Sequence, residues 1–137
     1  MDETEMRRRV DEARVARLAT VRPDGSPHVV PIVYAVDGDT LYTPVDEKPK
    51  RTPELQRLRN IAAEPRVELL VDHYEEEWDR LWWVRLGGRA HVVGEGPEHD
   101  RGAELLRAKY QQEAGWALQS MVVVQVETWR AWSFVRE

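Results

Sequence analysis

Two short turn sequences near the N-terminus constrain the fold more than any other feature of the chain. The tetrapeptide PDGS at 23–26 and the tripeptide DGD at 37–39 are made of residues that favour reverse turns. The flanking stretches are rich in β-branched residues, which predicts strands at 17–21, 28–36 and 40–45. Strands joined by such tight turns pair antiparallel, so the pattern argues against a doubly wound parallel sheet.

The remainder of the chain continues this pattern with three more strands and three helices. Two adjacent glycines, Gly87 and Gly88, interrupt the longest strand and predict a bulge or sharp bend there. We therefore expect a mainly β fold, a six-stranded antiparallel barrel with helices, formed as one domain over 1–137. The further strands are expected at 66–74, 81–93 and 121–135, and the helices at 3–16, 53–63 and 97–112.

The predicted strand 28–36 is apolar on both of its faces. One face can fill the interior of the barrel. The other face must be covered by something outside the barrel, such as a second subunit or a ligand.

Composition excludes several classes of function. The chain has 137 residues, a formal net charge of −5 and no cysteine. Without cysteine there can be no disulfide, thiolate nucleophile or iron–sulfur cluster. The acidic balance disfavours a role in binding nucleic acid. A chain without cysteine also fits a reducing compartment, and we expect a cytoplasmic protein.

No segment has the length and apolarity of a membrane span. The longest clean apolar run, at 121–126, is far shorter than the roughly 20 residues that a helix needs to cross a bilayer. We therefore expect no membrane partner.

Metal and nucleophile chemistry find little support. The four histidines, at positions 28, 73, 91 and 99, do not stand at a spacing typical of metal ligands. No serine lies in a G-x-S-x-G sequence. We predict no metal site and assign no catalytic residue.

A basic segment before the second helix is the first candidate binding site. Lys48, Lys50 and Arg51 precede a helix that begins at Thr52-Pro53, a favourable helix start. Cations beside the free N–H groups of a helix N-terminus can bind phosphate or carboxylate. Arg57 and Asn60 follow on one face of that helix. An equally good interpretation is a solvated basic loop.

A tryptophan-rich segment is the second candidate. Trp78, Trp82 and Trp83 occur close together, and on a strand Trp82 and Trp83 point to opposite faces. One of the two therefore meets a partner chain or a flat ligand, unless the tryptophans pack in the core or in a dimer interface.

Three segments resemble a known family: ARLATVRPDGSPHVVPIVY, LYTPVDEKPKRTPELQRLRNIAAEPRVELLVDHY and RLWWVRLGGRAHVV. They are similar to the split β-barrel flavoproteins of the pyridoxamine-phosphate-oxidase class, an FMN-binding-protein-like fold. More narrowly, they resemble the actinobacterial branch that uses the deazaflavin coenzyme F420. The resemblance runs over residues 14–135.

The resemblance implies a homodimer with two cofactors at the subunit interface. The basic residues would hold the phosphate end, two strands would lie against the ring system, and a tryptophan of the partner chain would close the pocket. The cofactor-binding residues implied in this way are Val29, Val30, Pro31, Ile32, Thr43, Pro44, Val45, Lys48, Lys50, Arg51, Arg57, Asn60 and Trp78 or Trp82.

The implied function is that of an F420-dependent oxidoreductase. It would transfer a hydride between the deazaflavin ring and a small unsaturated or quinone-like substrate. Two alternatives remain open on the same fold: an FMN-dependent oxidase or reductase, and a non-catalytic protein that binds a flavin or deazaflavin.

Overall fold

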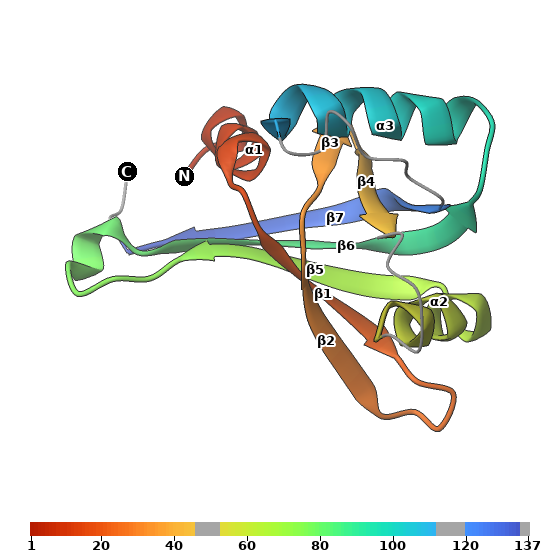
Figure 1. Ribbon diagram of the computed structural model, residues 1–137. Coiled ribbons are helices and arrows are strands. Elements are labelled where there is room, and N and C mark those ends of the chain that lie inside the picture. The colour runs from red at the N-terminus through yellow and green to blue at the C-terminus, as the bar shows by residue number, and fades with distance from the viewer. Residues whose placement is uncertain (46–52, 112–119, 135–137) are drawn as a thin grey trace.

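One antiparallel β-sheet forms the centre of the computed structural model, which describes residues 1–45, 53–111 and 120–134 (Figure 1). The seven strands that it describes lie in the order β2-β1-β5-β6-β7-β4-β3. The strands are β1 (Ala16–Val21), β2 (Pro27–Ile32), β3 (Ala35–Asp37), β4 (Thr40–Val45), β5 (Arg66–His73), β6 (Trp82–Val93) and β7 (Ser120–Ser133). The helices are α1 (Glu3–Glu12), α2 (Pro53–Ala63), α3 (Pro97–Lys109) and the short 3₁₀ helix η1 (Trp78–Arg80).

The structure corrects the predicted number of strands, because 28–36 is not one strand. It divides into β2 and β3, separated by Val33 and Tyr34. The hydroxyl of Tyr110 accepts a hydrogen bond from the Tyr34 N–H at 3.2 Å and lies 3.1 Å from the Tyr34 carbonyl oxygen. The same hydroxyl lies 3.0 Å from the Arg14 carbonyl oxygen, so its one proton has two possible acceptors. The strand is interrupted at this contact.

The break places β2 and β3 at opposite edges of the sheet, although only two residues separate them in the chain. The sheet must therefore curl until its edges approach each other, but its hydrogen-bonded order stays open. The expectation of an antiparallel, mainly β fold with helices is confirmed. The edge strand β2 contains Pro27 and Pro31, which have no N–H to offer another strand.

The predicted irregularity at Gly87-Gly88 is confirmed. Gly87 pairs with Thr128 and Gly88 with Val126, so the pairing of β6 with β7 skips Glu127. A Cβ on Gly88 would lie 2.1 Å from the backbone oxygen of Gln125. Only glycine allows the two backbones to approach this closely.

Two hydrophobic clusters hold the elements together. The larger lies on the inner side of the curved sheet and includes Met6 and Val10 of α1. The smaller lies under α3, where Leu106 packs with Tyr42 of β4 and Met121 of β7. The two clusters use alternate residues of β4 and β7, so α1 and α2 pack on the inner face of the sheet and α3 on its outer face. Figure 1 shows α2 at the right-hand end of the sheet.

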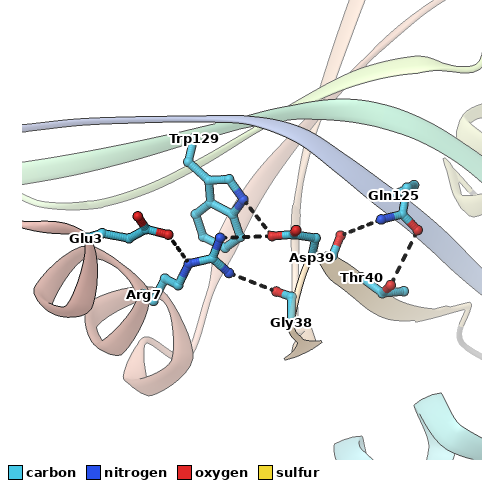
Figure 2. Close-up of polar contacts among 7 residues, drawn as sticks. All are labelled: Glu3, Arg7, Gly38, Asp39, Thr40, Gln125 and Trp129. Atoms are coloured by element: carbon cyan, nitrogen blue, oxygen red, sulfur yellow. Dashed lines mark hydrogen bonds and ion pairs between the residues drawn. The ribbon is translucent and has the colours of Figure 1, made fainter.

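Arg7 fixes α1 to the rest of the fold (Figure 2). Its guanidinium group donates to the Asp39 carboxylate at 2.9 Å, ion-pairs with Glu3 and stands 4.3 Å from the centre of the Trp129 ring. The indole N–H of Trp129 donates to the same Asp39 oxygen at 3.2 Å. Trp129 therefore serves packing between α1, β7 and the β3–β4 turn.

None of the α-helices in the described ranges is long and apolar enough to cross a membrane.

Candidate functional site

Five polar residues lie together where α2 meets the end of the curved sheet. They come from strands β1, β2 and β4 and from helix α2. We call these residues the polar cap: Thr20, His28, Thr43, Arg57 and Asn60.

Asn60 anchors α2 to the sheet. It is fully buried, and its side-chain N–H donates to the Thr20 hydroxyl at 2.9 Å. The side-chain amide of Gln56, one helical turn earlier, donates to Oδ1 of the Asn60 side chain at 2.7 Å. A buried amide with partners on both sides is held in one orientation.

Arg57 brings a positive charge to the same place. Its side chain is only 7% exposed, and its guanidinium donates to the backbone oxygen of Pro44 at 3.2 Å. A buried cation of this kind attracts an anionic group, because the low local dielectric strengthens the attraction.

His28 and Thr43 contribute polar atoms to the cap that the described residues leave without hydrogen bonds. Nδ1 of His28 and Oγ1 of Thr43 are both buried and unpartnered. Such atoms cost free energy in a folded protein unless a water or a ligand satisfies them. Among the described residues, the two atoms are therefore open to a hydrogen bond from a water or a ligand.

The surroundings of His28 favour the uncharged form of its ring. Burial lowers the pKa of its imidazole, and the positive charges of Arg22 and Arg57 lower it further. Thr20 lies directly opposite His28 in the β1–β2 pairing, so both side chains point to the inner side of the sheet.

The structure brings together four of the predicted cofactor-binding residues: Thr43, Pro44, Arg57 and Asn60. On β2, Val30 and Ile32 point inward, whereas Val29 (60% exposed) and Pro31 point outward. Val45 is buried at the end of β4. The predicted residues Lys48, Lys50 and Arg51 lie outside the described part of the chain.

Trp78 and Trp82 are not part of the polar cap of their own chain. Trp82 is the first residue of β6. Ala90, eight residues further along the same strand, donates its N–H to the carbonyl oxygen of Pro65, which lies just after α2. Eight residues of extended strand span about 26 Å. Figure 1 accordingly shows η1 and α2 at opposite ends of the sheet.

The tryptophans near η1 divide as the alternation of a strand requires. Trp82 is half-buried against the core, with the Arg9 guanidinium 5.2 Å from its ring centre. Trp83 points to the other face, where it pairs in register with Trp132 of β7. Phe134 contacts both Trp132 and Trp78, edge to face at 6.4 Å between ring centres. We call Trp78, Trp83, Trp132 and Phe134 the aromatic patch.

Sequence reasoning missed Thr20 and His28 as residues of one site. The signal was available, because the predicted hairpin about the turn at 23–26 places positions 20 and 28 nearly opposite each other. Among the described residues, no group of three or more histidine and acidic side chains could hold a metal ion.

Residues 2–133 match the family model for pyridoxamine 5'-phosphate oxidase. The chain belongs to the pyridoxamine 5'-phosphate oxidase family. The resemblance inferred from the sequence is thus confirmed at the level of the family. Among curated proteins, no sequence match to the chain was found.

Solved structures of similar fold include several proteins with different ligands. The conserved protein Rv2991 of Mycobacterium tuberculosis superposes with a TM-score of 0.79 at 24% identity, covering 97% of this chain and 85% of its own. A FAD-binding protein of Mesorhizobium loti gives 0.70 at 21% identity, with 96% and 93% covered. A heme-binding protein of Mycobacterium smegmatis gives 0.76 at 21% identity, with 96% and 54% covered. At these identities the likeness shows the fold alone.

Proposed function

We propose that this member of the pyridoxamine 5'-phosphate oxidase family is an oxidoreductase that uses coenzyme F420. Its substrate would be a small unsaturated or quinone-like compound. The observation that carries the proposal is the polar cap, where two buried, unpartnered polar atoms accompany a buried arginine.

The residues of the polar cap fit a cofactor that joins a planar ring to a phosphate. Arg57 supplies positive charge for an anionic group, and the Thr43 hydroxyl can both donate and accept a hydrogen bond. Asn60 keeps α2 in place and so orients Arg57. When bound, the deazaflavin would supply hydride transfer.

FMN is the alternative cofactor for the same residues, because it also carries a phosphate and a three-ring head. A non-catalytic carrier is the second candidate function. The similarity to FAD-binding and heme-binding proteins supports keeping both alternatives in the test.

The proposal includes a homodimer that forms through the outer face of the sheet. Trp78 is 65% exposed and Phe134 49%, and large exposed aromatic groups in a small protein are typical of an interface. The Arg85 guanidinium lies 5.1 Å from the centre of the Trp83 ring, and arginine is enriched at protein interfaces. Since Trp78 lies far from the polar cap of its own chain, only a second copy could bring it to one. Trp82 is half-buried against the core of its own chain and is the weaker of the two candidates.

The deciding experiment is a set of fluorescence titrations of the purified protein with F420, FMN and heme. Tight binding of F420 alone, at one site per chain, is the expected result. Preference for FMN would move the function to the flavin branch, and preference for heme would favour a carrier. Binding of none would refute a cofactor site in the polar cap.

Two variants test where the cofactor binds. Arg57→Ala should weaken binding of F420, whereas Arg59→Ala, an exposed arginine on the same helix, should not. The double variant Lys50→Ala/Arg51→Ala should also weaken binding while leaving the protein folded. Unchanged affinity in that double variant would remove the basic segment from the proposed site.

A further inference from the structure

His28 is the residue of the polar cap whose chemistry the proposed function leaves unexplained. It stands on the inner face of β2, opposite Thr20, whose hydroxyl is bound by Asn60 of α2. Its Nδ1 is buried and has no hydrogen-bond partner among the described residues. A ring nitrogen held in this way can accept a hydrogen bond when the ring is neutral and donate one when it is charged.

In the described part of the chain, the two charged side chains that shift the pKa of the His28 ring are both positive. Arg22 follows β1, and Arg57 belongs to α2. The acidic residue of the nearby turn, Asp24, accepts hydrogen bonds from Ser26. Thr20 and Asn60, the remaining cap residues near the ring, carry no charge. The environment of His28 thus opposes a third positive charge until an anion is present.

We infer that His28 contacts the ligand of this site through Nδ1, and that its imidazole takes up a proton from solvent when an anionic, phosphate-bearing ring compound binds. The inference rests on the proposed function, since it concerns the same site. No covalent bond changes: one proton moves from solvent to the ring, and Nδ1–H then donates to the ligand.

Proton uptake makes ligand affinity depend on pH in a defined direction. An anion beside His28 favours the charged ring, so its pKa rises on binding. Affinity therefore increases as the pH falls through the range between the pKa values of the bound and the free protein. Above that range the affinity no longer changes with the state of His28.

The test is isothermal titration calorimetry with F420 and with FMN, in two buffers of different ionisation enthalpy. It is run near pH 6.5, about the ordinary pKa of histidine. The wild-type protein should show buffer-dependent heats that correspond to uptake of part of a proton per site. His28→Gln should abolish the buffer dependence and weaken binding about tenfold, the loss typical of one charge-assisted hydrogen bond.

His91→Gln is the matched control. His91 is exposed on β6, and its Nε2 lies 2.8 Å from a carboxylate oxygen of Glu98, away from the polar cap. This variant should keep both the affinity and the proton uptake of the wild type.

A measurement on the unsubstituted protein keeps the inference testable if His28→Gln fails to fold. The His28 ring, observed by NMR, should titrate at a higher pH in the presence of FMN or inorganic phosphate than without them. An unmoved titration would overturn the inference.

The two proposals can fail separately. Cofactor binding without proton uptake, or uptake that persists in His28→Gln, would overturn the role of His28 and leave the proposed function standing. Absence of binding by F420, FMN and inorganic phosphate would overturn both.

Discussion

The ammonium nitrogen of Lys109 lies 4.0 Å from the centre of the Tyr34 ring and 5.3 Å from that of Tyr110. It is buried, and no described residue forms a hydrogen bond with it. The same two tyrosines form the contact that ends β2 and sets the start of β3. A buried cation that faces two aromatic rings therefore lies beside the break between the two edge strands.

Replacing Lys109 by methionine should stabilise the protein at neutral pH. Burial lowers the pKa of Lys109 from 10.5 to about 8, because the loss of hydration outweighs the attraction of the Asp11 carboxylate. Methionine fills similar space without a charge, and we expect a gain of about 1 kcal/mol in the free energy of unfolding. Urea unfolding of both proteins at pH 7 measures the difference.

The gain should shrink as the pH rises. Between about pH 8 and 10.5 the unfolded chain keeps a proton on Lys109 that the folded protein has released, so wild-type stability increases there relative to Lys109→Met. A difference that stays constant up to pH 10.5 would show that the buried charge is not its cause.

Asn60→Ala should destabilise the protein by about 1–3 kcal/mol, because it leaves the buried Thr20 hydroxyl and the Gln56 amide without their partner. Thermal or urea unfolding measures the loss. Arg59→Ala, on the exposed side of α2, serves as the control and should change stability by less than about 0.5 kcal/mol. Equal effects of the two substitutions would contradict the anchoring role of Asn60.

The two glycines of the bulge should respond differently to alanine. A Cβ at position 88 meets backbone atoms of Gln125, so Gly88→Ala forces β6 and β7 apart and should cost more than about 3 kcal/mol. At position 87 the nearest atoms are side-chain oxygens of Glu68 and Thr128, and the Glu68 side chain can move. Gly87→Ala should cost clearly less, and the reverse order in unfolding experiments would refute this account.

Removing two rings of the aromatic patch should weaken the proposed dimer. Buried aromatic side chains at interfaces each contribute about 2 kcal/mol or more, so Trp78→Ala/Trp132→Ala should raise the dimer dissociation constant at least about a hundredfold. Analytical ultracentrifugation gives the constant, and Val92→Ala, an exposed residue outside the patch, is the control. A wild-type protein that sediments as a monomer at all concentrations would rule out the interface.

The order of helices and strands could be predicted from the sequence because its causes are local. Turn residues, apolar alternation and the Gly87-Gly88 pair each act within a few positions, and the structure confirms the elements they indicated. The interruption at Val33–Tyr34 could not be predicted in this way. Its cause is the side chain of Tyr110, 76 residues away along the chain.

In the polar cap too, the residues that a local pattern indicates could be predicted, and those brought in by contacts distant in sequence could not. Arg57 and Asn60 were found through their spacing on one helix face, which is a local pattern. Thr43 was found only through a resemblance, and Thr20 and His28 were missed as site residues. His28 is brought near α2 by the pairing of β1 with β2 and by the packing of α2 on β1. Neither contact can be predicted from the spacing of residues on a helix.

The position of β7 has a consequence for the order in which the protein folds. β7 lies between β6 and β4, and its residues 120–125 pair with residues 40–45. During synthesis the β1–β2 hairpin can form early, but β4 then has only β3 beside it until β7 has been made. Contacts so distant in sequence are closed late and slow the folding of small domains. The N-terminal half therefore gains its full stability only after β7 is inserted.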